Sequence, residues 1–213
     1  KRVLDDNIRL FAENGVKGVF EQGTYDTPNS ELAALKAYLI AKYLWDPAYD
    51  ESRAMGEFLD AYFGKAAAHV RRYIDLTHDH VERDRVHVGI FAPVTHPHLT
   101  PELLMEANTL WDGAEASVRG TPAVLERVRW ARMSPDYAIV EIGRAIAKLP
   151  SEQRSGPQRA LMALARRFGT FMDAINSSGL TRIHEWKDMD KGEYRVKLQT
   201  DLGMAEGEDH GKQ

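Results

Sequence analysis

The stretch Val16-Lys17-Gly18-Val19-Phe20-Glu21-Gln22-Gly23 governs how the whole chain is interpreted. It concentrates strand-forming residues in few positions, and it leads into the polar loop Thr24-Tyr25-Asp26-Thr27-Pro28. Helical patterns precede and follow it, which gives the order helix, strand, polar loop and helix. That unit is the repeat of parallel α/β sheets and barrels. We therefore expect one buried strand that ends in a cluster of polar groups.

The polar side chains at the end of this strand are the first candidates for a functional site. In parallel α/β folds the loops after the strands converge on one crevice, where small molecules bind. The candidates are Glu21, Gln22, Tyr25 and Asp26. A single parallel strand cannot form a sheet, so we expect this unit to be the end of something larger.

The composition is that of a globular protein with a sizeable core. The chain has 213 residues, of which 43% are hydrophobic, and a formal net charge of -4. Its basic residues are scattered along helical patterns, which argues against a nucleic-acid partner. No apolar run reaches the length of a membrane span, and the lack of Cys excludes disulfides and thiolate metal sites. The chain starts at Lys1 without Met or a signal peptide, so we expect a fragment or a processed protein.

Apolar periodicity predicts helices on both sides of the strand. A helix over residues 4–14 should end at Gly15 in a left-handed cap, and a later one should end at Gly64. The helix over residues 32–44 is apolar nearly all round in its second half, so we expect it to be buried on more than one side. A further helix should follow over residues 67–81.

Helix-starting chemistry recurs in the second half of the chain. Thr100-Pro101-Glu102 combines a capping hydroxyl, Pro at the first position and an acid near the positive end of the helix dipole, and Thr121-Pro122 repeats the device. The pattern that follows contains Pro135, where we expect a kink or a break. One last amphipathic helix should cover residues 161–175. The polar chain after it should be a loose tail, in which residues 194–198 could pair as a strand.

The histidines and the lack of cofactor motifs argue against a metal or a cofactor. The pairs His78-Asp79-His80 and His96-Pro97-His98 are the most suggestive spacings. Residues two apart on a helix diverge by about 200°, so His78 and His80 cannot chelate one ion together. The chain has no HExxH spacing, no Gly-rich phosphate loop and no nucleophile elbow. We therefore expect neither a metal site nor a cofactor.

Aromatic and basic residues on the helices are expected to be structural. Trp45 and Trp111 fall on apolar helix faces, which favours core packing over a role as sugar platforms. The group Arg127, Arg129 and Arg132 is expected to be a solvated helix face with some ion pairing.

Several stretches of the chain resemble an uncharacterised family of bacterial domains of unknown function, commonly described as alpha-glucuronidase-like or glycoside-hydrolase-like. The resemblance extends to about residue 180. It rests on residues 18–23 (GVFEQG), 31–47 (ELAALKAYLIAKYLWDP), 58–64 (FLDAYFG), 99–104 (LTPELL) and 127–132 (RVRWAR). The ending Tyr43-Leu44-Trp45-Asp46-Pro47 is also similar to the last barrel helix of alpha-glucuronidases and of beta-N-acetylglucosaminidase-like glycosidases.

The resemblance implies a mainly α chain that holds one terminal β/α unit of a (β/α) barrel, followed by a C-terminal helical bundle. Residues 1–46 would be the final helix, strand and helix of a TIM-like barrel, residues 47–185 a helical domain, and residues 186–213 a polar tail. The missing N-terminal barrel would then be the chain's main partner, and a homodimer contact through the helical domain is also allowed. The family resemblance implies a periplasmic or secreted protein.

The resemblance implies a glycoside hydrolase that acts on an oligo- or polysaccharide, with the helical domain supporting the barrel. Such hydrolysis normally uses two carboxyl groups. Glu21 could supply one of them as the catalytic residue or bind a sugar hydroxyl, with Gln22, Tyr25 and Asp26 binding the substrate. Alternatively Glu21 orders the loop or pairs with Lys17 or with an Arg of a neighbouring strand. Asp26 would then order the loop, and Tyr25 would pack on its own scaffold.

Two classes of function therefore stay open. In the first, the chain is part of a carbohydrate-active enzyme and is inert by itself. In the second, it is a non-catalytic helical scaffold or a carbohydrate-binding or interaction module.

Overall fold

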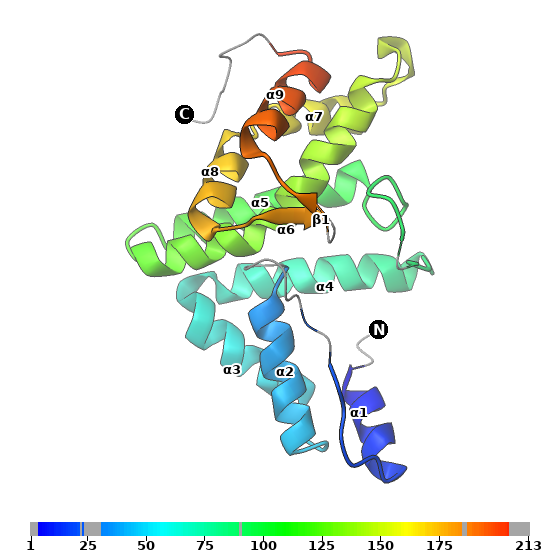
Figure 1. The fold of residues 1–213 in the computed structure, drawn as a ribbon, viewed down its shortest axis with the longest axis vertical. Coiled ribbons are helices and arrows are strands. Elements are labelled where there is room, and N and C mark those ends of the chain that lie inside the picture. The colour runs from blue at the N-terminus through cyan, green and yellow to red at the C-terminus, as the bar shows by residue number, and fades with distance from the viewer. Residues whose placement is uncertain (1–3, 22, 24–30, 90, 185–186, 205–213) are drawn as a thin grey trace.

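The chain is a stack of α-helices, and the only strands among the described residues form one short hairpin (Figure 1). The computed structural model describes residues 4–21, 23, 31–89, 91–184 and 187–204. The helices are α1 (Leu4–Glu13), α2 (Ala33–Trp45), α3 (Glu51–Phe63), α4 (Ala67–Arg83), α5 (Pro101–Ser117), α6 (Pro122–Ala147), α7 (Gly156–Ala165), α8 (Gly169–Ser178) and α9 (Lys191–Asp201), with the short 3₁₀ helices η1 (Gly64–Ala66) and η2 (Ser151–Gln153). The hairpin pairs β1 (Arg182–His184) antiparallel with β2 (Lys187–Asp188). The expected mainly helical character is confirmed.

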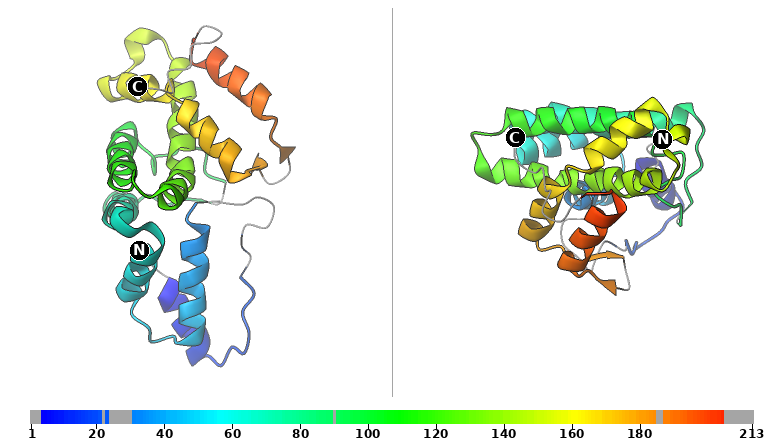
Figure 2. Two further views of the ribbon diagram at one scale, coloured as in Figure 1. Left: turned by 90° about the vertical axis from the view of Figure 1, so that its left-hand side faces the viewer. Right: turned by 90° about the horizontal axis from the view of Figure 1, so that it is seen from above.

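The described residues form two hydrophobic cores, one mainly between α1–α5 and one mainly between α5–α9. The helices around them follow one another along the long axis of the molecule (Figure 2). We call the part around the first core, built on α1–α4, the N-terminal lobe, and the part around the second core, built on α6–α9, the C-terminal lobe. Helices α5 and α6 contribute to both. Trp111 and Val128 belong to the first core, whereas Leu104 and Ile139 belong to the second.

Large aromatic side chains fill the first core. Tyr43, Phe63 and Trp111 are almost completely buried, and the rings of Tyr73 and Trp111 lie 5.2 Å apart between their centres. Burying a side chain of this size contributes about 1.5–3 kcal/mol. The expected core position of Trp111 is confirmed.

Local signals at the helix ends act as the sequence predicts. Gly15 and Gly64 follow α1 and α3 with positive φ angles of 73° and 53°, which residues with a Cβ adopt only at a cost. The Thr100 hydroxyl accepts a hydrogen bond of 3.2 Å from the backbone N–H of Leu103 and so caps α5. Thr121 precedes α6, but its side chain does not cap the helix. Of the predicted Thr121-Pro122 start signal, only Pro122 at the first helical position acts as expected.

The structure does not show the buried strand predicted at residues 16–23, of which it describes residues 16–21 and 23. Residues 16–21 carry no regular secondary structure, and Val16 and Phe20 are exposed. A parallel strand exists only when a neighbouring strand accepts and donates its backbone hydrogen bonds, and in the described part of the chain β1 and β2 pair only with each other. The structure therefore shows the helices that flank the expected β/α unit without its strand.

The second half of α2 is not buried on several sides. Leu35, Leu39 and Tyr43 face the first core, but Leu44 is exposed and Trp45 is 92% exposed. The expectation that Trp45 packs in the core is wrong because no described element covers that face of the helix.

Three predictions about later helices are also corrected. Helix α6 runs without interruption through Pro135, which is buried, so packing of the helix outweighs the cost of about 3 kcal/mol for an internal proline. The single helix expected over residues 161–175 is two, α7 and α8, separated at residues 166–168. Residues 194–198, expected as a strand within a loose tail, lie inside α9.

Helix α9 belongs to the second core despite its polar composition. Leu198 and Leu202 are fully buried, and Asp201 accepts a hydrogen bond of 2.8 Å from Arg144 Nε on α6. The Tyr194 hydroxyl donates to Glu141 at 2.8 Å, and Glu141 in turn accepts from Arg144 Nη1 at 2.7 Å. One buried guanidinium thus fastens the final helix to α6.

Helices α6 and α7 approach each other closely at Gly143. A Cβ at this position would overlap the Cβ of Ala165 on α7. The absence of a side chain therefore sets how near the two helices can lie.

Candidate functional site

The structure places Glu21 on the surface, in the segment that follows α1. Gln22, Tyr25 and Asp26, the residues predicted to bind substrate, lie outside the described residues. The cluster of polar groups expected at a strand end is therefore neither assembled nor contradicted.

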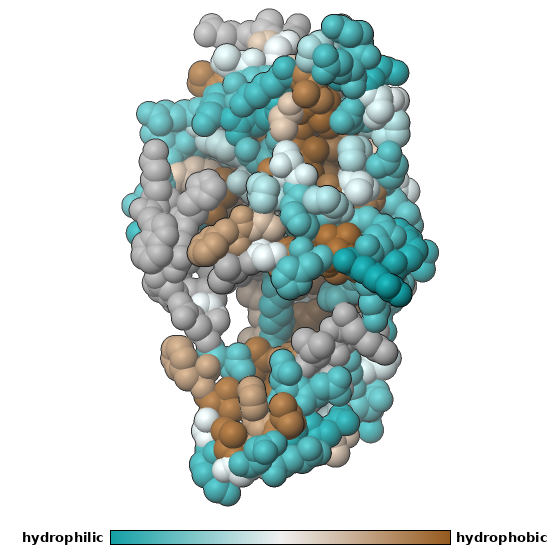
Figure 3. All heavy atoms as spheres, turned by 90° about the vertical axis from the view of Figure 1, so that its right-hand side faces the viewer, coloured by the Kyte–Doolittle hydropathy of each residue, from teal (hydrophilic) through white to brown (hydrophobic). Residues whose placement is uncertain are grey.

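An exposed apolar surface is the main feature of the N-terminal lobe. We use the name N-terminal apolar surface for the exposed large apolar side chains of α1, the following segment and α2, namely Leu10, Val16, Phe20, Leu44 and Trp45. The side chains of Phe20 and Trp45 are 88% and 92% exposed. Figure 3 shows apolar atoms at the lower end of the molecule, where Figure 1 places α1 and the end of α2, and further apolar atoms higher on the same face.

A network of salt bridges ties α2 to α3 beside this surface. Glu57 on α3 accepts hydrogen bonds from Lys42 at 3.2 Å, from Tyr49 at 2.8 Å and from Arg53 at 3.0 Å. These bonds, above all those from Tyr49 and Lys42, lower the pKa of Glu57 to about 2. The network fixes α2 in place while its outer apolar face stays uncovered.

A second candidate site is a polar cleft of about 450 Å³ between α5, α6 and the turn that joins α7 to α8. We call it the Arg132 cleft. Its charged and amide residues include Asn108, Asp112, Glu115, Arg132, Asp136 and Arg167.

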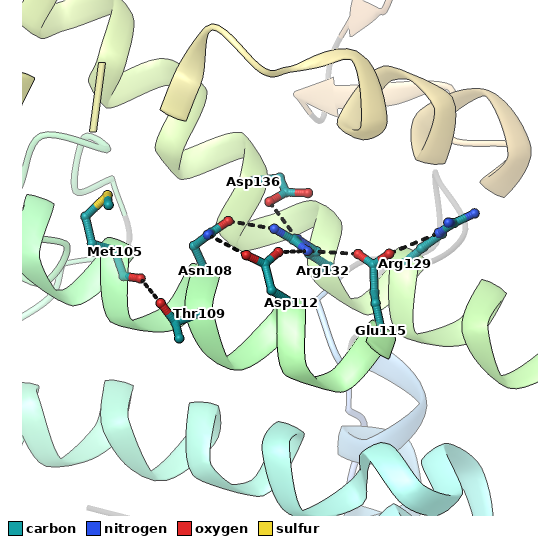
Figure 4. Close-up of polar contacts among 8 residues, drawn as sticks. All are labelled: Met105, Asn108, Thr109, Asp112, Glu115, Arg129, Arg132 and Asp136. Atoms are coloured by element: carbon teal, nitrogen blue, oxygen red, sulfur yellow. Dashed lines mark hydrogen bonds and ion pairs between the residues drawn. The ribbon is translucent and has the colours of Figure 1, made fainter. Parts of the chain in front are cut away.

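Helical spacing brings these groups together. Asn108, Asp112 and Glu115 lie four and three residues apart on α5, so they share one face of that helix, and Arg132 and Asp136 lie four apart on α6. The close-up in Figure 4 shows the two faces meeting.

Arg132 lies at the centre of the cleft, and all three nitrogens of its guanidinium group donate hydrogen bonds. Its Nε donates to Asp136 at 3.2 Å, and its Nη1 donates to Asp112 and Glu115, both at 2.8 Å (Figure 4). Its Nη2 donates to the amide oxygen of Asn108 at 2.6 Å. These bonds connect α5 with α6 at the place where the two cores meet.

The Asp136 carboxyl group is the most perturbed acid of the cleft. Its burial raises the pKa to about 6, against the opposing attraction of Arg132. Only 13% of the side chain is exposed. A carboxyl group that titrates near neutral pH inside a cleft is a recurrent feature of functional sites.

Sequence reasoning missed this cleft. The expectation of a solvated face for Arg127, Arg129 and Arg132 holds for Arg129, which is exposed and pairs with Glu115. It is wrong for Arg132, whose side chain is only 13% exposed. Arg127 donates to the backbone oxygen of Tyr62 at 2.8 Å and stacks on its ring.

The two histidine motifs lie side by side without forming a metal site within the described residues. His80 is buried, and its Nε2 lies 3.0 Å from the backbone oxygen of Pro97. The rings of His96 and His98 contact each other through their Nδ1 atoms at 3.0 Å. These contacts fasten the connection between α4 and α5 to the end of α4.

Comparison with known proteins finds a family match for the first part of the chain. Residues 1–75, about one third of its length, match the family described as a domain of unknown function, DUF4838. No curated protein and no solved structure matches the chain. The matched range contains α1, α2, α3 and most of the N-terminal lobe, including the whole N-terminal apolar surface.

Across the described residues, no helix combines the length and the apolar character that a membrane span requires.

Proposed function

We propose that this chain is the helical, supporting part of a glycoside-hydrolase-like carbohydrate-active protein, of the alpha-glucuronidase-like type. In this proposal its N-terminal apolar surface packs against a (β/α) barrel. The single observation that carries the proposal is the exposure of that surface, above all of Phe20 and Trp45. Large exposed apolar patches favour a surface that another body covers.

A barrel suits this surface better than a small partner does. The outer helices of a barrel bury an apolar stripe against the strands, and α2 exposes such groups on the face opposite its core residues. Covering Phe20 and Trp45 contributes about 1.5–3 kcal/mol for each side chain. Residues 16–21 would pair with a neighbouring strand of the barrel, which supplies the hydrogen-bonding partners that the described residues do not offer.

The proposed catalytic role of Glu21 depends on the packing of this chain against the barrel. At the carboxyl end of a paired strand it would be one of the two carboxyl groups of a glycosidase, with Gln22, Tyr25 and Asp26 as substrate-binding neighbours. The isolated chain, which has no barrel to complete the site, is expected to be inactive.

The test uses the longer protein in which the chain is joined to its barrel, assayed on aryl glycosides and glucuronides with sugar binding measured in parallel. In Glu21→Gln, cleavage should be lost while binding is kept, because the change removes the ionisable group and preserves the shape. Glu13→Gln, at the end of α1, is the matched control and should cleave like the wild type. If the wild type neither cleaves nor binds any of these sugars, the glycosidase proposal fails.

A non-catalytic scaffold or interaction module is the second candidate. It is favoured by the completeness of the two cores, in which residues such as Tyr43, Trp111 and Leu161 are buried by this chain alone. Sugar binding without cleavage in the same experiment would support this candidate.

A further inference from the structure

We propose that the Arg132 cleft binds a small oxyanion, a carboxylate or a phosphate, through the guanidinium groups of Arg119, Arg129 and Arg167. This site lies on α5, α6 and the α7–α8 turn, apart from the N-terminal apolar surface, and does not depend on the proposed glycosidase role. The argument follows from which hydrogen-bonding groups of the cleft are already used.

The acceptors of the cleft are largely committed. Asp112 accepts from Arg132 through one carboxylate oxygen and from the Asn108 amide, at 3.0 Å, through the other. Glu115 accepts from Arg132 through one oxygen and from Arg129, at 3.3 Å, through the other. One oxygen of Asp136 accepts from Arg132. A cation entering the cleft would therefore have to displace guanidinium groups from these acids.

Donors, in contrast, remain in excess. Arg119 and Arg167 line the cleft, are exposed, and make no side-chain hydrogen bond or ion pair with the described residues. Arg129 uses its Nε for Glu115, which leaves both terminal nitrogens of its guanidinium group for another acceptor. The Thr170 hydroxyl lines the same cleft and adds a neutral donor. Because guanidinium groups only donate hydrogen bonds, they favour a ligand that has many hydrogen-bond acceptors.

The charge of the lining agrees with this assignment. Four arginines, Arg119, Arg129, Arg132 and Arg167, line the cleft together with the three acids Asp112, Glu115 and Asp136. The surplus positive charge favours an anion. Planar guanidinium groups match carboxylate and phosphate oxygens in paired hydrogen bonds, which explains their use at oxyanion sites.

The cleft is also firm enough and wide enough to hold such a ligand. Its floor contains Ile139, Val140, Phe168 and Phe171, all buried in the second core. Its volume of about 450 Å³ exceeds what a bare phosphate needs, so an organic molecule that carries the oxyanion also fits.

The test titrates the protein with inorganic phosphate and with acetate at constant ionic strength, by calorimetry and by NMR of the arginine Nε–H signals. Saturable binding of either anion is expected, with shifts at Arg129 and Arg167. The anion that binds more tightly identifies the class, phosphate or carboxylate. Absence of saturable binding by both anions overturns the proposal.

Substitutions locate the binding. Arg119→Gln and Arg167→Gln should each weaken binding about tenfold or more, because each removes a charge-assisted hydrogen bond to the anion. Neither side chain holds the fold together, so the melting temperature should not change. Arg72→Gln, an exposed arginine on α4, is the matched control and should bind like the wild type. An equal loss of binding in the Arg72 variant would show that the anion meets only the general charge of the protein, and would overturn the site.

Discussion

The two lobes differ in how their hydrophobic cores are covered. The N-terminal lobe buries a core of aromatic side chains but leaves Phe20 and Trp45 in solvent. The C-terminal lobe covers its core with α9, a mostly polar helix that Arg144 fastens through Asp201 and Glu141. Both lobes have a buried core, so the buried area alone does not distinguish them; the exposed apolar side chains do. Paired polar groups cover the second core at α9, whereas Phe20 and Trp45 stay exposed beside the first core.

The largest expected effect contrasts a phenylalanine from each lobe. Phe168→Ala should lower the free energy of unfolding by about 3–5 kcal/mol, because Phe168 is only 2% exposed in the second core. Phe20→Ala should change it by no more than about 0.5 kcal/mol, since Phe20 already faces solvent. Urea denaturation of both variants measures the difference. Comparable losses would mean that Phe20 is buried in solution, and the comparison between the lobes would fail.

A smaller effect concerns the packing of helices within each lobe. Gly143→Ala should destabilise the protein by about 1–3 kcal/mol, because the added methyl group overlaps Ala165. Gly56→Ala, inside α3 where a Cβ meets no atom within 4 Å, should instead stabilise the protein by about 0.5–1 kcal/mol. Thermal unfolding of the pair gives the sign of each change. A gain in stability for Gly143→Ala would contradict the close approach of α6 and α7.

The last effect concerns the junction between the lobes and depends on pH. The folded-state pKa of Asp136, raised from 3.8 to about 6, means that between these values the folded protein holds a proton that the unfolded chain releases. Stability should therefore fall as the pH rises through this window. Asp136→Asn removes that dependence, so the variant should gain about 1–2 kcal/mol relative to the wild type between pH 4 and pH 6.

Urea denaturation at several pH values measures this gain. The exposed Asp79→Asn on α4 is the control and should follow the wild type. A parallel dependence on pH in Asp136→Asn and the wild type would show that Asp136 does not titrate in this window.

Signals that act within a few residues were readable from the sequence. Gly15, Gly64 and the Thr100 hydroxyl end or start helices through their own backbone or through neighbours on the chain, so their roles did not depend on the rest of the fold. The start of α9 carried a similar signal that was missed. Asp190 accepts a hydrogen bond of 2.9 Å from the N–H of Glu193, and this capping pattern favours a helix over the strand predicted there.

Features that depend on distant neighbours were not readable. Trp45 and Trp111 both lie on apolar helix faces, yet only Trp111 is covered, because burial depends on which other helices reach that face. The Arg132 cleft likewise requires α5 and α6 to face each other, and Arg132 lies 20 residues from Asp112. The strand expected at residues 16–23 needed a partner strand, which periodicity within one segment cannot supply.

Because α6 contributes side chains to both cores, the two lobes should not be separated in engineered proteins. Its 26 residues extend for about 39 Å at 1.5 Å per residue and supply Val128 to one core and Ile139 to the other. A cut in the connection before α5 would strip the first core of Trp111, and a cut after α6 would leave the second core without α7–α9. Fragment expression, domain exchange and fusion should therefore keep residues 4–204 together.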